Sequence, residues 1–146
     1  MFSSFFTVSP ADLDTWGHPE VGHEVDGVVV GTHLTYDKVL RFCGFAWVEF
    51  FESLGTGLFV PHIAMTRLEC DYFAEVTLGE IRCDTSVLRL GRSSMRLQID
   101  VHQNAVKDAA AIATLISFDH VHSRSVALTD AQREALARHL AAASGE

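Results

Sequence analysis

The stretch that decides the fold is residues 36–54, YDKVLRFCGFAWVEFFESL. Apolar side chains recur in it at the three- and four-residue spacing of an α-helix and cover most of its circumference: Val39, Leu40, Cys43, Ala46, Trp47, Phe50, Phe51 and Leu54. Thr35 is suited to cap the N-terminus of this helix, and Gly55 is suited to end it in the left-handed region. The sequence therefore predicts a long helix that is buried on most sides.

Four strand-like segments follow this helix. Turn signals at Gly79 and at Gly91-Arg92 separate the first three, and the segments span residues 63–73, 80–90, 94–103 and 110–121. In the third, apolar and polar side chains alternate, whereas the fourth is apolar on both faces, as in a central strand. Antiparallel strands after an almost wholly apolar helix have one economical arrangement, a curved sheet wrapped around the helix. We therefore expect an α+β fold with a long central helix.

Shorter elements flank this unit. A strand over residues 5–8, closed by Ser9-Pro10, leads into a loop that carries Asp12, Asp14 and Gly17. Residues 25–30 are typical of a short strand or an extended loop. A last helix is expected from the capping box at residues 129–132 to about Ala143.

Composition narrows the class of protein. A chain of 146 residues with 48% hydrophobic content suits one domain, residues 1–146. The net charge of -8 argues against a nucleic-acid surface. No apolar stretch reaches the roughly 18 residues that cross a bilayer, and the first residues lack the features of a signal peptide, so we expect a cytoplasmic protein with no membrane partner. Three widely spaced cysteines are typical of buried free thiols: Cys43, Cys70 and Cys83.

Two regions resemble the 4-hydroxybenzoyl-CoA thioesterase-like branch of the hotdog superfamily. The first is DLDTWGH at residues 12–18, in which an Asp is followed three residues later by Gly and then by His. The second comprises LECDYF at 68–73, LGE at 78–80 and LRLGRSSM at 88–95. The resemblance runs from Val8 to about Leu136 and implies a hotdog fold and acyl-CoA thioesterase activity. Relatives continue directly from the Gly-His pair into the helix, so residues 19–34 are expected to be an insertion.

The resemblance implies a set of catalytic residues around the helix entrance. Asp14 matches the family's catalytic Asp, although an Asp that only caps the turn before Gly17 is the plain alternative. Asp12 lies five residues before Gly17 rather than three and is the weaker choice. His18 is a candidate to position the acyl carbonyl or to activate water, and its alternative is a loop histidine without a role.

The helix entrance supplies the remaining candidates. The family's aromatic or His position there falls on Tyr36, with His33 and Thr35 close by, and together with Gly17 these residues are expected around the oxyanion and the substrate. Free N–H groups and the positive end of the helix dipole suit an oxyanion. Backbone groups near Thr35 and Tyr36 are therefore the expected donors.

The turn with Arg89, Arg92 and Ser93 is implied by the resemblance to lie near the nucleotide end of coenzyme A, where guanidinium groups pair with phosphate. A plain hairpin turn with exposed arginines is the alternative. No metal site is expected, because the histidines have no recognised ligand spacing and no cysteine joins them. Glu49 matches the catalytic Glu of another hotdog branch, but it belongs to a polar stripe, which favours a solvated or dimer-contact role.

The leading hypothesis is hydrolysis of an acyl-CoA or acyl-carrier-protein thioester, with Asp14 as nucleophile or general base and no cofactor besides the coenzyme A of the substrate. The alternative is a hotdog module that binds an acyl thioester without hydrolysing it. A dehydratase on the same fold is a third, but its signatures are missing. The exposed edge of a curled sheet predicts a homodimer or, as in many relatives, a homotetramer.

Overall fold

The computed structural model describes residues 1–13, 22–25, 28–31, 33–55 and 62–142, with only the backbone of the two segments between 22 and 31. The elements are, in chain order, β1 (Phe2–Val8), the 3-10 turn η1 (Pro10–Asp12), β2 (Gly22–Val25), β3 (Val28–Gly31), α1 (Tyr36–Leu54), β4 (Ile63–Tyr72), β5 (Gly79–Leu90), β6 (Ser94–Gln103), β7 (Val106–Asp119), β8 (Arg124–Ser125) and α2 (Asp130–Ala137).

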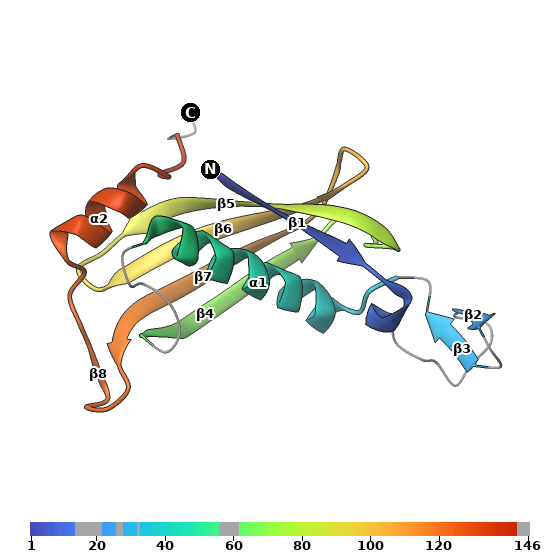
Figure 1. Cartoon of the computed structure of the whole chain (residues 1–146), viewed down its shortest axis with the longest axis horizontal. Coiled ribbons are helices and arrows are strands. Elements are labelled where there is room, and N and C mark those ends of the chain that lie inside the picture. Colours follow the sequence, from blue (N-terminus) through green and yellow to red (C-terminus); the bar gives the residue numbers. More distant parts are fainter. Residues whose placement is uncertain (14–21, 26–27, 32, 56–61, 143–146) are drawn as a thin grey trace.

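In the described part of the chain, one antiparallel sheet has the strand order β1-β5-β6-β7-β4, and β8 pairs with β7. The helix α1 lies across one face of this sheet, and β4 forms an edge (Figure 1). The expected α+β hotdog arrangement, a curved sheet around a long helix, is confirmed. The hairpin of β2 and β3 forms a separate small sheet beyond the start of α1 (Figure 1).

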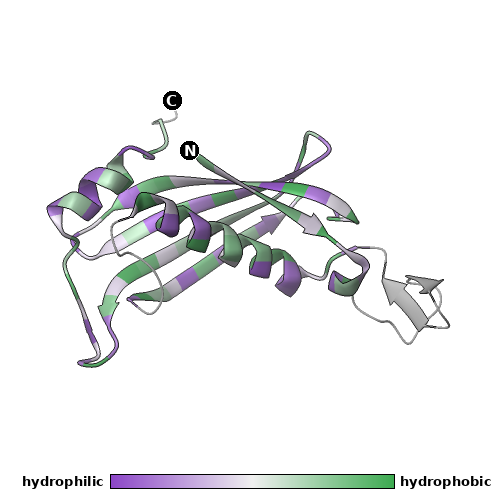
Figure 2. Ribbon diagram, in the orientation of Figure 1, coloured by the Kyte–Doolittle hydropathy of each residue, from purple (hydrophilic) through white to green (hydrophobic). Residues whose placement is uncertain are grey.

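The core lies between α1 and the inner face of the sheet. Apolar residues alternate along the strands, and green and purple bands therefore alternate in Figure 2. The inner side of β6 is fully buried through Leu97, Ile99 and Val101, and the helix contributes Phe50 and Phe51. Burying large side chains of this kind contributes roughly 1.5–3 kcal/mol each, which makes this layer the main source of stability.

The edge strand β4 lies beyond the three strands on which α1 mainly packs. The helix packs on β1, β5 and β6. On β4, three inward-facing side chains stay 40–44% exposed: Met65, Leu68 and Tyr72. The described chain therefore leaves an apolar strip along an unpaired strand edge.

Three bounds differ from the sequence expectation by three or more residues. The first strand, expected over residues 5–8, is β1 and begins at Phe2. The strand expected over 110–121 is β7 and begins earlier, at Val106, because it forms a hairpin with β6 at Gln103. The last helix ends at Ala137 rather than near Ala143. Val87 N–H donates to His139 O at 2.9 Å and Ala141 N–H donates to Val87 O at 2.8 Å. Because residues 139–141 pair with β5 in this way, they do not continue the helix.

The cysteines are unpaired, as expected. Cys43 and Cys83 are buried in the core and Cys70 is partly buried. Burial raises the pKa of the Cys83 thiol to about 12 and raises that of Cys43 further. No helix among the described residues has the length and apolar character needed to span a membrane.

Candidate active site

The turn η1 fixes the chain that leaves β1. Ser9 N–H donates to Asp12 Oδ2 at 2.8 Å, and Ser9 Oγ donates to the same oxygen at 3.1 Å. The Asp12 carboxylate is thus used to close the turn. Leu13 is buried in the core and anchors the end of the turn. The predicted residues Asp14, Gly17 and His18 lie outside the described residues.

Among the described residues, the N-terminal end of α1 has polar groups without a hydrogen-bond partner in the helix. Thr35 is the N-cap, in an extended conformation, but its side chain makes no capping hydrogen bond, and its buried Oγ1 has no partner. The amides of Lys38 and Val39 are the first to bond back to Thr35 O, both at 3.1 Å. The two N–H groups before them, on Tyr36 and Asp37, have no acceptor within the helix. The helix dipole adds a partial positive charge at the same place, so this point attracts an oxyanion.

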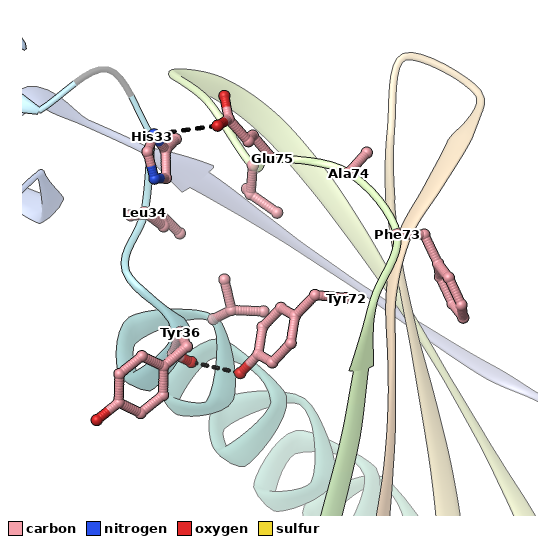
Figure 3. Close-up of a pocket in the computed structure, with 9 residues that line it drawn as sticks. His33, Leu34, Tyr36, Tyr72, Phe73, Ala74 and Glu75 are labelled. Carbon is pink, nitrogen blue, oxygen red and sulfur yellow. Dashed lines mark hydrogen bonds and ion pairs between the residues drawn. The ribbon is translucent and has the colours of Figure 1, made fainter. Parts of the chain in front are cut away.

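A cavity of about 360 Å³ opens beside this first turn. Figure 3 shows its walls, which come from the entrance to α1 and from the chain after β4: His33, Leu34, Tyr36, Val39 and residues 72–76. Tyr72 Oη donates to Tyr36 O at 2.8 Å and joins the two walls. The Tyr36 ring points away from Tyr72 and is 71% exposed. The cavity therefore combines an aromatic wall with the donor end of a helix.

His33 forms the polar rim of the cavity. Its Nδ1 lies 3.6 Å from Glu75 Oε1, too far for a hydrogen bond, and this buried nitrogen has no other partner. His33 and Thr35 thus place two unpartnered polar atoms at the entrance to α1. Buried polar groups without partners are uncommon, and a bound ligand is one way to satisfy them.

The loop after β4, residues 73–78, is held by hydrogen bonds to β6 and β7. The amides of Phe73 and Ala74 donate to Asp108 O at 2.7 and 3.1 Å. The Gln103 side chain accepts from Thr77 N–H at 3.0 Å and donates to Thr77 O at 2.8 Å. These bonds keep the cavity wall in one position.

Burial shifts the pKa values of two side chains next to this loop, Asp108 and Tyr72. The Asp108 carboxyl is 3% exposed and its Oδ2 has no partner. Desolvation raises the pKa of Asp108, and the neighbouring His102 partly offsets this effect. Burial likewise raises the pKa of Tyr72, which keeps its hydroxyl protonated as the donor to Tyr36 O.

The predicted nucleotide-binding turn lies elsewhere in the protomer. Arg89, Arg92 and Ser93 are at the β5–β6 turn, beside α2, whereas α1 begins at the opposite end of the sheet (Figure 1). The carbonyls of this turn are engaged: Arg133 Nη2 donates to Gly91 O at 2.7 Å, and Leu128 N–H donates to Arg92 O at 2.9 Å. A single chain therefore does not bring this turn to the helix entrance.

Sequence reasoning missed the residues that build the cavity wall. Tyr72, Glu75 and Gln103 were not predicted as site residues. Gln103 had a signal, because it continues the inward-facing alternation of β6 and a buried amide there needs a partner. Glu49, on α1, is exposed, as its polar stripe predicted. Among the described residues, no group of three or more His, Cys, Asp or Glu could hold a metal ion.

Residues 38–110, half of the chain, match the thioesterase superfamily. No protein of curated function matches the sequence. Solved structures with the same fold include a predicted thioesterase from Bacillus stearothermophilus (19% identity, TM-score 0.76, covering 95% of this chain and 96% of that one). A thioesterase from Thermus thermophilus in complex with coenzyme A and Zn is 23% identical (TM-score 0.74, 93% and 91% covered). A 1,4-dihydroxy-2-naphthoyl-CoA thioesterase from Synechocystis is 14% identical (TM-score 0.72, 93% and 95% covered).

Proposed function

Because this chain belongs to the thioesterase superfamily, we propose that it hydrolyses an acyl-CoA or acyl-carrier-protein thioester at the entrance to α1. The observation that carries the proposal is the cavity of about 360 Å³ at the uncapped first turn of α1. A thioester carbonyl placed there meets N–H donors and a positive dipole end, which stabilise the charge that develops on its oxygen. Coenzyme A bound to the Thermus thermophilus thioesterase of the same fold supports this substrate class.

The proposed nucleophile or general base is Asp14. In the first case its carboxylate attacks the carbonyl carbon, and in the second it takes a proton from the attacking water. Either route gives a tetrahedral oxyanion next to the N–H groups of Tyr36 and Asp37, and its collapse breaks the C–S bond. In the general-base route, the proton taken by Asp14 passes to the leaving thiolate, which gives the free acid and the thiol. In the nucleophile route, the thiolate takes a proton from solvent, and water then hydrolyses the acyl anhydride on Asp14 to the free acid and the carboxylate. The match to the superfamily begins at Lys38, so the role of Asp14 rests on the DLDTWGH motif and on its position just after η1.

Neighbouring groups have supporting roles in this proposal. His18 orients the acyl carbonyl, and Gly17 allows the backbone to approach the substrate. His33 and Thr35 offer the unpartnered Nδ1 and Oγ1 to polar atoms of the substrate. Tyr36 contributes its N–H to the oxyanion, and its exposed ring flanks the entrance.

A second copy of the chain completes the proposed site. The exposed strip of Met65, Leu68 and Tyr72 lies along the unpaired edge of β4, and antiparallel pairing of two such edges would cover it. The two-fold axis of such a homodimer exchanges the ends of the sheets, so it carries the turn with Arg89, Arg92 and Ser93 towards the partner's helix entrance. These groups would then bind the phosphates of coenzyme A, and pairs of dimers would give a homotetramer. Sedimentation of Leu68→Asp as a monomer, with the wild type dimeric or larger, is the expected result.

The test is thiol release from short, long and aromatic acyl-CoAs and from an acyl-carrier protein, by the wild type, Asp14→Asn and Asp12→Asn. Loss of the carboxylate at position 14 is expected to lower kcat by about 10²- to 10⁴-fold. Asp12→Asn keeps an acceptor oxygen for Ser9 and is the matched control, with a much smaller effect. Tight acyl-CoA binding without turnover by the wild type would instead support the non-catalytic binding module.

A further inference from the structure

Lys38 joins the turn η1 to the start of α1, on the two sides of the expected insertion. Its Nζ donates to the backbone carbonyl of Asp12 at 2.6 Å, across 26 residues of sequence. Asp12 closes η1, which precedes the insertion of residues 19–34, and Lys38 is in the first turn of α1, which follows it. The hydrogen bond is partly buried and is made by a charged donor, which makes it stronger than one between neutral groups. The chain that leads to Asp14 is thereby tied to the helix entrance.

The helix entrance is held on two sides. On the cavity side, Tyr72 Oη bonds to Tyr36 O at 2.8 Å and Leu34 N–H donates to Val76 O at 2.8 Å. On the side of η1, the contact comes from Lys38, and the rings of Phe42 and Phe45 pack against Phe6 of β1 at 5.7 and 6.1 Å between centroids. The first turn of α1 is therefore held in place by contacts on both sides, and η1 is attached to it through Lys38.

Chain geometry makes this attachment relevant to catalysis. Two residues of chain span at most about 7 Å, so fixing the Asp12 carbonyl limits where a side chain two residues later can lie. A catalytic group must be held close to its reacting atom, and displacements of about 1 Å can cost about 100-fold in rate. The hydrogen bond from Lys38 therefore restricts where the chain that leads to Asp14 begins relative to the oxyanion donors.

We propose that Lys38 is a positioning residue that fixes η1, from which the chain continues to Asp14, relative to the N–H donors of the first turn of α1. The inference rests on the proposed function, because Asp14 is the group that Lys38 positions. It adds a residue that does not touch the reacting atoms and that acts through Asp14. The insertion is then compatible with catalysis, since η1 before it and α1 after it are joined by this hydrogen bond.

The test compares Lys38→Met, which removes the donor and keeps the length, with Lys38→Arg, which keeps a cationic donor. Lys107→Met is the matched control, because it removes the chain's other lysine, whose Nζ pairs with Asp100 at 3.1 Å on β6. Hydrogen exchange is followed at the amides of Asp12 and Leu13, which bond to Ser9 O and Pro10 O within η1. Steady-state thiol release is measured for each variant, in the wild-type and in the Asp14→Asn background.

Lys38→Met is expected to speed exchange at Asp12 and Leu13 by about tenfold and to lower kcat by about 10- to 100-fold with little change in KM. Lys38→Arg should restore both, and Lys107→Met should change neither. In the Asp14→Asn background, Lys38→Met should have no further effect, because residues that act as a unit are not additive.

Three outcomes would overturn the proposal: unchanged exchange in Lys38→Met, an equal effect of Lys107→Met, or a full additional loss of kcat in the Asp14→Asn background. Failure of the proposed function is separate. It would show as no turnover by the wild type, or as full turnover by Asp14→Asn. In either case, hydrogen exchange at Asp12 and Leu13 would still decide whether Lys38 holds η1.

Discussion

The two ends of α1 differ in almost every physical respect. At its C-terminal end, Phe50 and Phe51 are fully buried, and their rings lie 5.5 Å apart and pack against Phe2, Trp47 and His139. Gly55 then ends the helix with φ 62°, and its N–H donates to Glu52 O at 3.3 Å. At its N-terminal end, Tyr36 is 71% exposed, Thr35 leaves its hydroxyl unpaired, and a cavity adjoins the first turn.

This difference shows how one helix serves both stability and chemistry. The closed end, defined as residues 47–55 with α2, buries the rings of Phe50 and Phe51 and ends in the hydrogen bond from Gly55 N–H to Glu52 O. The open end, defined as residues 33–39 with the loop 72–78, has two buried side-chain atoms without a hydrogen-bond partner among the described residues, His33 Nδ1 and Thr35 Oγ1. Unpaired buried groups cost free energy, which the packing at the other end of the same helix can offset.

The largest expected effect on stability is at the closed end. Phe50→Ala should lower the free energy of unfolding by about 3–5 kcal/mol, because it opens a cavity in a fully packed layer. Tyr36→Ala, at the open end, should change it by no more than about 0.5 kcal/mol, since the ring is exposed and the bonded carbonyl belongs to the backbone. Urea unfolding of both variants measures the contrast, and similar losses would remove the distinction between the two ends.

A smaller effect separates the two N-caps. Thr129 Oγ1 accepts from Gln132 N–H at 3.1 Å at the start of α2, so Thr129→Val should cost about 1 kcal/mol. Thr35→Val, at the start of α1, removes a hydroxyl that has no partner and should be neutral or stabilising. Thermal unfolding of the pair gives the comparison. An equal loss in both would mean that Thr35 caps its helix in solution.

The smallest effect is a pH-dependent one on the two ends of β7. The pKa of Asp108 is raised by burial, so the stability that it contributes is present below the unfolded pKa of about 3.9 and is lost as the pH rises through its folded pKa. Asp108→Asn should therefore be more stable than the wild type at pH 7, with the difference vanishing below about pH 4. Unfolding by urea at both pH values measures this difference.

Asp119, at the other end of β7, is the control of opposite sign. Hydrogen bonds from His122 lower its pKa, so its contribution is present above about pH 3.9 and is lost as the pH falls through its folded pKa. Asp119→Asn should be less stable than the wild type at pH 7. Shifts of the same sign in both variants would contradict the assignment of burial to Asp108.

The part of the fold that could be predicted was encoded locally. The helix over residues 36–54 was predicted with the bounds it has, because both Thr35 and Gly55 mark its ends. The end of α2 was wrong by about six residues, because Val87 of a distant strand pairs with the tail. Local propensity carries no information about such a partner.

The same division applies to the candidate site. His33, Thr35 and Tyr36 could be predicted at the helix entrance, since they directly precede or begin α1. Tyr72 and Lys38 could not, because their roles depend on contacts across 36 and 26 residues of sequence. The roles of Asp14 and His18 stay predictions from the motif.

The most direct test of the open end as the reaction site is hydrogen exchange with and without a non-hydrolysable thioether analogue of an acyl-CoA. The account predicts that the analogue protects the amides of residues 33–39 and 72–76 and leaves residues 47–55 unchanged. Protection confined to the closed end, or absent from the first turn of α1 at saturating analogue, would contradict the account.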